Sequence, residues 1–547
     1  MSSGREVITL QFGHQSNFVG AHWWNIQESG FNYDPTSPPS EINHDVLYRE
    51  GINHRNEVTF TPRAIIVDLH GSLNHLKTSG ELYDDPGVPS PETVPWQEDK
   101  IEVVTTDQPV KNEFLQQLEK EDGEGVSENG KMIFELDNDI NVWSDYLKTR
   151  FHPRTLSIVN EYKHNDNNRP FESYIQGAEV WNSPNFEEDW CDKCRLFVEE
   201  SDNLQGFQIL MDSTNGFSGL AGEALQYLND EYNSKSVLTF PVLMSTSSSY
   251  STDEESMRIV NLVMAFAKSS EFSSLVVPMS CHNTAWRQYG PGRNFQHLNY
   301  DVNFSYHTSA ILASFLETVS LYYRRRSDAY RMLNLCSSVT PTGRKMANAV
   351  LSLPFALGEN GNLLRTLELW EGPLWSSLTP HCEVDESVAL QSVAVRGIQK
   401  HQLIPTILRP QDQCNPLFNH TTSAGMLDAY LTFSCDGVSS QVISIEENIS
   451  TTAPYPNIFS EHIQRDGSFS SNPRPSFMAV EKSSSIAGLQ SAKSTGDMLS
   501  SLHSEASRLN LRRILKSATS DLEVEDYSEA KETLLCLSEC YSDNMFI

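Results

Sequence analysis

Hydrophobic and polar positions follow one another along the chain in patterns that predict buried strands alternating with helices. Residues 6–13 alternate and end in glycine, which indicates a strand, and residues 16–27 have the spacing of a helix. Continuous apolar runs predict further strands at 62–71, 207–211 and 237–244. Such runs are typical of parallel strands that are covered on both faces. The alternation of strands and helices therefore predicts an open α/β sheet.

Three polar loops begin where predicted strands end, at Gly13, Asp68 and Asp212. Ligands of open α/β sheets bind beside the carboxyl ends of the strands. The loop at 212–222 leads into a helix whose apolar face is formed by Leu220, Ala224, Leu225 and Leu228. A strand, a turn rich in Gly and Ser and a helix start together present backbone N–H groups to an anion. The pattern leaves open whether this loop binds a nucleotide or is an inherited shape with another use.

The rest of the chain divides by composition. Residues 80–130 are rich in Pro, Gly and acids and predict a surface insertion, whereas the Ser/Pro-rich residues 452–501 predict a second long loop. Residues 309–326 and 342–357 have helical patterns, and residues 386–398 alternate like a strand. An acidic C-terminal helix is expected to direct three leucines inward, namely Leu534, Leu535 and Leu537.

Charge narrows the possible partners. The 547 residues include 40 Lys and Arg against 72 Asp and Glu, a formal net charge of −32. Such acidity argues against nucleic-acid binding and against docking to anionic lipid by charge alone. The start of the sequence has neither the pattern of a signal peptide nor that of a mitochondrial presequence, and no stretch reaches about 18 apolar residues. We expect a cytosolic protein with peripheral membrane contact only.

Candidate metal and redox chemistry is sparse. Nine cysteines scattered through a large chain suit a reducing compartment, and the lone pair Cys191 and Cys194 is interpreted as two structural thiols. The two close histidines, His152 and His164, are predicted to lie on the surface, and no metal site is expected. The double tryptophan of residues 23 and 24 is predicted to anchor the core rather than a partner.

Several of these segments together resemble the tubulin superfamily, and within it the Misato family. Residues 11–24 (QFGHQSNFVGAHWW) resemble the first tubulin loop, G-Q-x-G-N-Q-I-G, with Gly13, Asn17 and Gly20 in place and His14 at the Gln position. The Misato branch in particular is indicated by the double tryptophan, the degenerate glycine loop and the acidic insertion.

Other segments extend the resemblance along most of the chain. Residues 63–71 (RAIIVDLHG) are similar to the tubulin segment A-x-x-V-D-L-E-P-G, and residues 204–208 (LQGFQ) are identical to the segment before its glycine loop. Residues 392–397 (SVAVRG) resemble a C-terminal-domain strand with V-F-R-G. Residues 525–541 resemble the helix F-T-E-A-E-S-N-M-N-D-L-V-S-E-Y.

The resemblance implies an α/β fold with a tubulin-like, nucleotide-type parallel-sheet domain, an intermediate α/β domain and C-terminal helices. We place the tubulin-like domain at 1–255, including the acidic insertion at 80–130. Central helices and the start of the intermediate domain are expected at 256–410, the rest of that domain with its Ser/Pro-rich loop at 411–501, and the C-terminal helical region at 502–547.

The resemblance also implies a vestigial nucleotide site. Its candidate residues are Gly13, His14, Gln15, Asn17, Asp68, Gly71, Asn215, Gly216, Ser218 and Gly219. Only Gly216 keeps its register in the tubulin pattern G-G-G-T-G-S-G, and Phe217, awkward beside a triphosphate, is predicted to plug the core instead. His70 stands where a tubulin Glu helps to hold magnesium, and imidazole is a poor Mg²⁺ ligand. For Asp68, a cap on the following turn and a phosphate-side role stay open. No cofactor is expected, and any GTP or GDP is expected to bind weakly.

Catalysis is expected to be absent. Aligning Leu353-Pro354-Phe355 with tubulin V-P-F places the acidic hydrolysis region at 339–347, but the sequence has no carboxylate from Ala329 to Gly358. Arg344 and Lys345 stand there instead, either as a solvated basic turn or as an anion contact. Without a water-positioning acid, neither GTP hydrolysis nor filament assembly is expected.

The resemblance to Misato implies a non-enzymatic regulator of mitochondrial distribution, morphology and fusion. That family is cytosolic and associates with the mitochondrial outer membrane, so protein partners there or on the cytoskeleton are implied, and no nucleic acid. The alternative is a GTP-binding, tubulin-like cytoskeletal or tubulin-assembly factor with slow or no GTPase activity.

Overall fold

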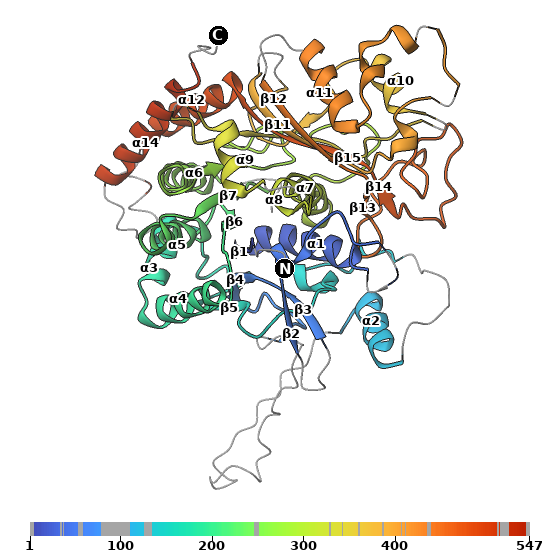
Figure 1. Cartoon of the computed structure of the whole chain (residues 1–547). Coiled ribbons are helices and arrows are strands. Elements are labelled where there is room, and N and C mark those ends of the chain that lie inside the picture. The colour runs from blue at the N-terminus through green and yellow to red at the C-terminus, as the bar shows by residue number, and fades with distance from the viewer. Residues whose placement is uncertain are drawn as a thin grey trace.

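A computed structural model (Figure 1) describes residues 5–542 apart from several segments. The segments left out lie at 33–35, 37, 53–57, 78–109, 125–133, 245–250, 328–329, 342, 359–360, 385–387, 406, 411, 435–438, 511–513 and 515–523. The predicted acidic insertion at 80–130 therefore lies largely outside the described residues, and its described part contains α2 (Glu113–Glu124).

The larger sheet has six parallel strands in the order β5-β4-β1-β6-β7-β8. Its strands are β1 (Val7–Phe12), β4 (Ala64–His70), β5 (Leu156–Lys163), β6 (Gly206–Asp212), β7 (Ser236–Val242) and β8 (Leu275–Val276). Every residue of β6 and β7 is buried, as the continuous apolar runs predicted, and so is every residue of β1, although its sequence alternates. The predicted α/β class with an open parallel sheet is confirmed.

Helices cover both faces of this sheet (Figure 1). On one face lie α3 (Tyr174–Trp181), α4 (Pro184–Glu199), α5 (Phe217–Tyr232) and α6 (Thr252–Phe272). On the other face α1 (His14–Ser29) packs against α7 (Ser305–Val319), which is followed by α8 (Leu321–Arg324) and α9 (Met332–Val339). Trp23 and Trp24 on α1 are both buried in the core of that second face, which confirms the prediction made for them.

The second sheet has the order β10-β9-β15-β11-β12, with β11 and β12 parallel and the other pairs antiparallel. Its strands are β9 (Asn348–Ser352), β10 (Ser376–Ser377), β11 (Val388–Arg396), β12 (Ser439–Ile445) and β15 (Ser485–Ala492). The helices α12 (Lys493–Ser507) and α14 (Val524–Glu539) pack on each other and on α6.

Smaller elements complete the described chain. They are the hairpin β2 (Tyr48–Ile52) and β3 (Val58–Pro62), the pair β13 (Ile449–Ser450) and β14 (Lys482–Ser483), α10 (Leu363–Glu368), α11 (Ser423–Ser434), and short 3-10 helices at His44–Val46, Trp143–Tyr146, Lys400–Gln402, Asp412–Cys414 and Pro416–Asn419. The domain boundaries stay predictions; α6 runs through residue 255, and β8 adds to the first sheet after it.

Three predictions about local structure are wrong. Residues 342–357 are not a helix, because their apolar centre forms β9 between β15 and β10. Residues 482–501 are not loop: β15 is a central strand in which all eight residues are buried, although four of them are Ser, Gly or Gln. On α14, Leu534 and Leu537 face inward as predicted, but Leu535 is 38% exposed.

Candidate functional site

The loop between β1 and α1 is filled by a carboxylate from β6. The Asp212 Oδ1 atom accepts hydrogen bonds from the backbone N–H of Ser16 at 2.7 Å and from its hydroxyl at 2.8 Å, and Oδ2 accepts from the Gln15 N–H at 3.1 Å. Gly13 has φ 110°, and a Cβ placed there would lie 2.4 Å from Asp212 Cγ. A helix N-terminus is the place where an external anion such as phosphate would bind. Here the protein supplies that anion itself.

Burial raises the pKa of Asp212 to about 6, against the effect of the hydrogen bonds from Ser16 and Gln15, which lower it. At neutral pH the side chain is therefore mostly ionised, and a negative charge lies at the N-terminal turn of α1. Gln15 also accepts a hydrogen bond at Oε1 from the Ser305 hydroxyl at 2.8 Å, which ties the same loop to the start of α7.

The start of α5 is closed in a different way. The helix begins at Phe217, inside the predicted loop at 212–222. Its first N–H groups donate inside the protein: Gly216 to the Phe171 carbonyl, Phe217 to Asn215 Oδ1, Ser218 to the Asn215 carbonyl and Gly219 to the Gly216 carbonyl. The Ser218 hydroxyl donates to the Asn215 carbonyl as well, at 2.6 Å. These groups satisfy the helix start without a ligand.

The remaining glycines of this loop allow α3 to approach. A Cβ at Gly219 would lie 1.8 Å from the Tyr174 carbonyl oxygen, and one at Gly216 would lie 2.7 Å from the Phe171 ring. Phe217 is 3% exposed and meets Phe171 edge to face at 5.1 Å. The prediction that Phe217 plugs the core is confirmed. Gly216 and Gly219 lack a side chain, and this lets the neighbouring segments pack at distances too short for a Cβ atom.

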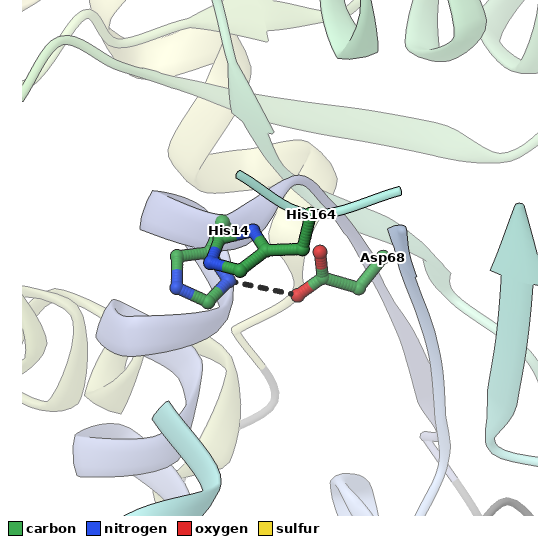
Figure 2. Close-up of side chains that lie close together, drawn as sticks. All are labelled: His14, Asp68 and His164. Atoms are coloured by element: carbon green, nitrogen blue, oxygen red, sulfur yellow. Dashed lines mark hydrogen bonds and ion pairs between the residues drawn. The ribbon is translucent and has the colours of Figure 1, made fainter. Parts of the chain in front are cut away.

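A second cluster lies beside the ends of β4 and β5 (Figure 2). His14 Nδ1 is 3.2 Å from Asp68 Oδ2, and the ring of His164 lies against that of His14 in a tilted arrangement with centroids 4.1 Å apart. Asp68 also accepts from Asn17 Nδ2 at 3.0 Å and from Trp143 Nε1 at 2.7 Å. The prediction that His164 lies on the surface is wrong, because it is half-buried against His14.

The charges in this cluster follow from its contacts. Burial alone would raise the pKa of Asp68, but His14 beside it and hydrogen bonds from His14 and Asn17 bring that pKa below its usual range. Burial, helped by His14, lowers the pKa of His164 to about 4, so this imidazole is neutral at pH 7. Asp68 Oδ1 also accepts from the N–H of Leu69, the next residue of β4, at 2.8 Å.

A cavity of about 380 Å³ borders the second cluster. Gly71, with φ 86°, lies on its wall together with His75, Asp145 and His164. His70 at the end of β4 is exposed. Gly71 and His164 place the cavity beside the ends of β4 and β5.

Of the two basic residues at 339–347, Arg344 has a structural role, so the interpretation as a solvated basic turn is wrong for it, whereas an anion contact stays a prediction. Arg344 is buried, and it donates from Nε to the Cys540 carbonyl at 3.0 Å and from a terminal nitrogen to Ser491 Oγ at 3.1 Å. Lys345 donates to the Ser273 carbonyl. The predicted region 339–347 lies between the end of α9 and the start of β9. Within α9 there is no carboxylate, and Asp328, the nearest one in sequence before it, lies outside the described residues.

Taken residue by residue, these contacts do not fit a bound nucleoside triphosphate. The N–H groups of Gln15 and Ser16, which would face phosphate, face Asp212, and the start of α5 is covered by α3. The sequence patterns did not predict that Asp212 fills the loop between β1 and α1, nor that His164 lies next to His14. His164 directly follows residues 156–163, which form β5 beside β4.

Comparison with known proteins decides the family. A model of the Misato Segment II tubulin-like domain matches residues 5–120, and a model of the tubulin domain matches residues 135–325. Protein misato of Drosophila melanogaster is 33% identical over the full length of both chains. Protein misato homolog 1 is 34% identical in Mus musculus and 32% identical in Homo sapiens, each over 98% of both chains.

The chain belongs to the Misato family.

Membership in the Misato family confirms the resemblance drawn from the loops after β1, β4 and β6, and the tubulin-like α/β fold that it implied. Two further features concern a cysteine on α4 and the described helices. Cys194 on α4 is buried in the core, where burial raises the pKa of its thiol well above the usual range. Among the described helices none is both long and apolar enough to cross a bilayer.

Proposed function

We propose that this Misato-family protein acts without hydrolysing a nucleotide, as a regulator of mitochondrial distribution, morphology and fusion. The family to which it belongs supports the biological role. The observation that carries the mechanism is the Asp212 carboxylate on the N–H groups of Gln15 and Ser16. A triphosphate brought to those groups would meet a buried negative charge instead of free donors.

In this proposal the tubulin-like sheet works as a scaffold that presents surfaces to protein partners. The protein acts from the cytosol, on the cytosolic face of the mitochondrial outer membrane, through protein partners there or on the cytoskeleton. The net charge of −32 makes direct adhesion to anionic lipid unfavourable, so contact with the membrane is peripheral and goes through those partners. The described part of the acidic insertion, α2, is where we would first look for such a surface, since its first turn and exposed face carry acids.

The test is depletion of the endogenous protein followed by rescue with the full chain, with the mitochondrial network scored by microscopy. We expect a disturbed network that the wild-type chain restores. External protease added to intact mitochondria should digest the bound fraction. An undisturbed network after depletion would refute the role, and full protection from protease would refute the location.

A second function, that of a GTP-binding tubulin-like cytoskeletal or tubulin-assembly factor, is favoured by the match of the tubulin domain over residues 135–325. Guanine nucleotide released from freshly purified protein separates the two. A bound nucleotide near one per chain would support this second function and contradict the scaffold proposal.

A further inference from the structure

Three side chains of the types that bind metal ions come together from three separate segments (Figure 2). His14 opens α1, Asp68 belongs to β4, and His164 directly follows β5. One candidate ligand atom from each residue lies within 4.8 Å of the other two. We propose that His14, Asp68 and His164 bind one divalent transition-metal ion of the zinc type.

The donor set selects the class of ion. Two imidazole nitrogens and one carboxylate oxygen suit Zn²⁺, whereas Mg²⁺ prefers oxygen ligands in octahedral geometry. The site is therefore distinct in chemistry from a magnesium site that depends on nucleotide phosphates.

The spacing is close to what a tetrahedral ion needs. Ligand atoms at about 2.0–2.1 Å from zinc lie roughly 3.3 Å from each other. The separation of 3.2 Å between His14 Nδ1 and Asp68 Oδ2 already has this value. Only His164, from the loop, has to move closer, and its ring nitrogens make no hydrogen bond with the described residues that such a movement would break.

The surroundings hold the first ligands in place. Asp68 is 1% exposed and is fixed by Asn17 Nδ2, Trp143 Nε1 and the N–H of Leu69. Outer hydrogen bonds of this kind orient the carboxylates and imidazoles of metal sites. The backbone N–H of His164 donates to the His70 carbonyl at 2.9 Å, which ties the third ligand to the end of β4.

A tetrahedral ion also needs a fourth ligand beside these three side chains. His164 lies on the wall of the space of about 380 Å³ that Gly71 and His75 also line. Of the three proposed ligands only His164 borders this space, and the fourth ligand would be a water molecule on that side. A bound ion would link the start of α1, the end of β4 and the residue that follows β5.

The experiment uses the full chain, treated with a chelator, in a background with Cys414→Ser and Cys536→Ser, which removes the two exposed thiols among the described cysteines. Zn²⁺ is titrated against a competing dye, and Co²⁺ is used as a spectroscopic probe of the ligands. We expect one site per chain and an affinity at least tenfold lower in His14→Gln and in His164→Asn. His401→Gln, at an exposed histidine, is the matched control and should bind as tightly as the parent chain.

Thermal unfolding gives an independent readout. Zn²⁺ should raise the melting temperature of the parent chain and of the control, and leave that of His164→Asn unchanged. His164 is only half-buried, so this variant is expected to fold, and its melting curve without metal checks that. Failure of the parent chain to take up zinc, or equal affinities in the parent chain and both ligand variants, would overturn the proposal.

Discussion

Asp212 and Ser16 are joined by two hydrogen bonds, one from the Ser16 N–H at 2.7 Å and one from its hydroxyl at 2.8 Å. The pair connects the end of β6 to the first turn of α1, two elements that are neighbours in space but almost two hundred residues apart in sequence. A negative charge in that position stabilises the positive end of the helix dipole. The same contact occupies the donors that a phosphate would need.

Freshly purified protein should therefore contain far less than one guanine nucleotide per chain. Loss of one metal contact and two backbone contacts to phosphate would weaken binding by roughly 3–5 kcal/mol, or about two to four decades in affinity. The measurement is release of small molecules by denaturation, followed by quantification of GTP and GDP. A yield near one per chain would contradict the expectation, and Gly216→Trp should then abolish it.

Removing the Ser16 hydroxyl should destabilise the protein. In Ser16→Ala the buried Asp212 carboxylate loses one of its donors, and hydrogen bonds to charged groups contribute about 1.5–3 kcal/mol. The midpoint of chemical denaturation should fall accordingly. Ser504→Ala is the matched control, because that exposed hydroxyl bonds only within its own helix, and it should change the midpoint little. Equal effects of the two substitutions would mean that Asp212 does not depend on Ser16.

The close approach of α3 and α5 can be tested at Gly219. In Gly219→Ala the new methyl group would meet the Tyr174 carbonyl at 1.8 Å, so one of the helices must shift. Overpacking of this kind costs about 1–3 kcal/mol or more. Gly358→Ala, where a methyl group would meet nothing within 4 Å, is the control. A neutral Gly219→Ala in thermal or chemical unfolding would show that the helices can separate at no cost.

The sequence predicted four strands of the first sheet, β1, β4, β6 and β7, because each is a patterned apolar segment that leads into a polar loop, but it did not predict β5 or β8. It failed at β15, where Ser485 and Ser491 lie buried in a central strand and look like loop residues in isolation. Their burial depends on pairing with β9 and β11, and neither partner is near in sequence. Tertiary pairing overrides composition at such places.

The candidate site shows the same limit. Gly13, Asn17 and Asp68 could be placed at one edge of the sheet from the ends of predicted strands alone. That Asp212 turns back onto α1, or that His164 reaches His14, depends on the order of strands and on side-chain direction. Arg344 is a sharper case: its sequence neighbours suggest a polar turn, and its partners Ser491 and Cys540 come from the far C-terminal part of the chain.

The buried histidine His22 should make stability depend on pH. Its Nε2 lies 3.0 Å from the Tyr306 carbonyl, and its ring packs between Tyr146 and Tyr306 with Tyr455 nearby. Burial lowers the pKa of His22 to about 3, and His307 contributes in the same direction. In the unfolded chain the same side chain has its ordinary pKa of 6.5. The folded protein therefore holds His22 neutral over a range in which the unfolded chain takes up a proton.

The sign follows from that difference. The stability due to neutral His22 is fully present above pH 6.5 and is lost progressively as pH falls toward 3. Between pH 7 and pH 5.5 the loss from this one group is about 1 kcal/mol. His22→Gln keeps a donor for the Tyr306 carbonyl but does not titrate. Between pH 7 and pH 5.5 its unfolding free energy should therefore fall less than that of the wild type, by the amount that His22 contributes. His401→Gln, at an exposed position, should keep the wild-type dependence. If urea titrations at the two pH values gave parallel changes for wild type and His22→Gln, the histidine would be protonated in the fold, and its burial between the tyrosines would have to be incomplete.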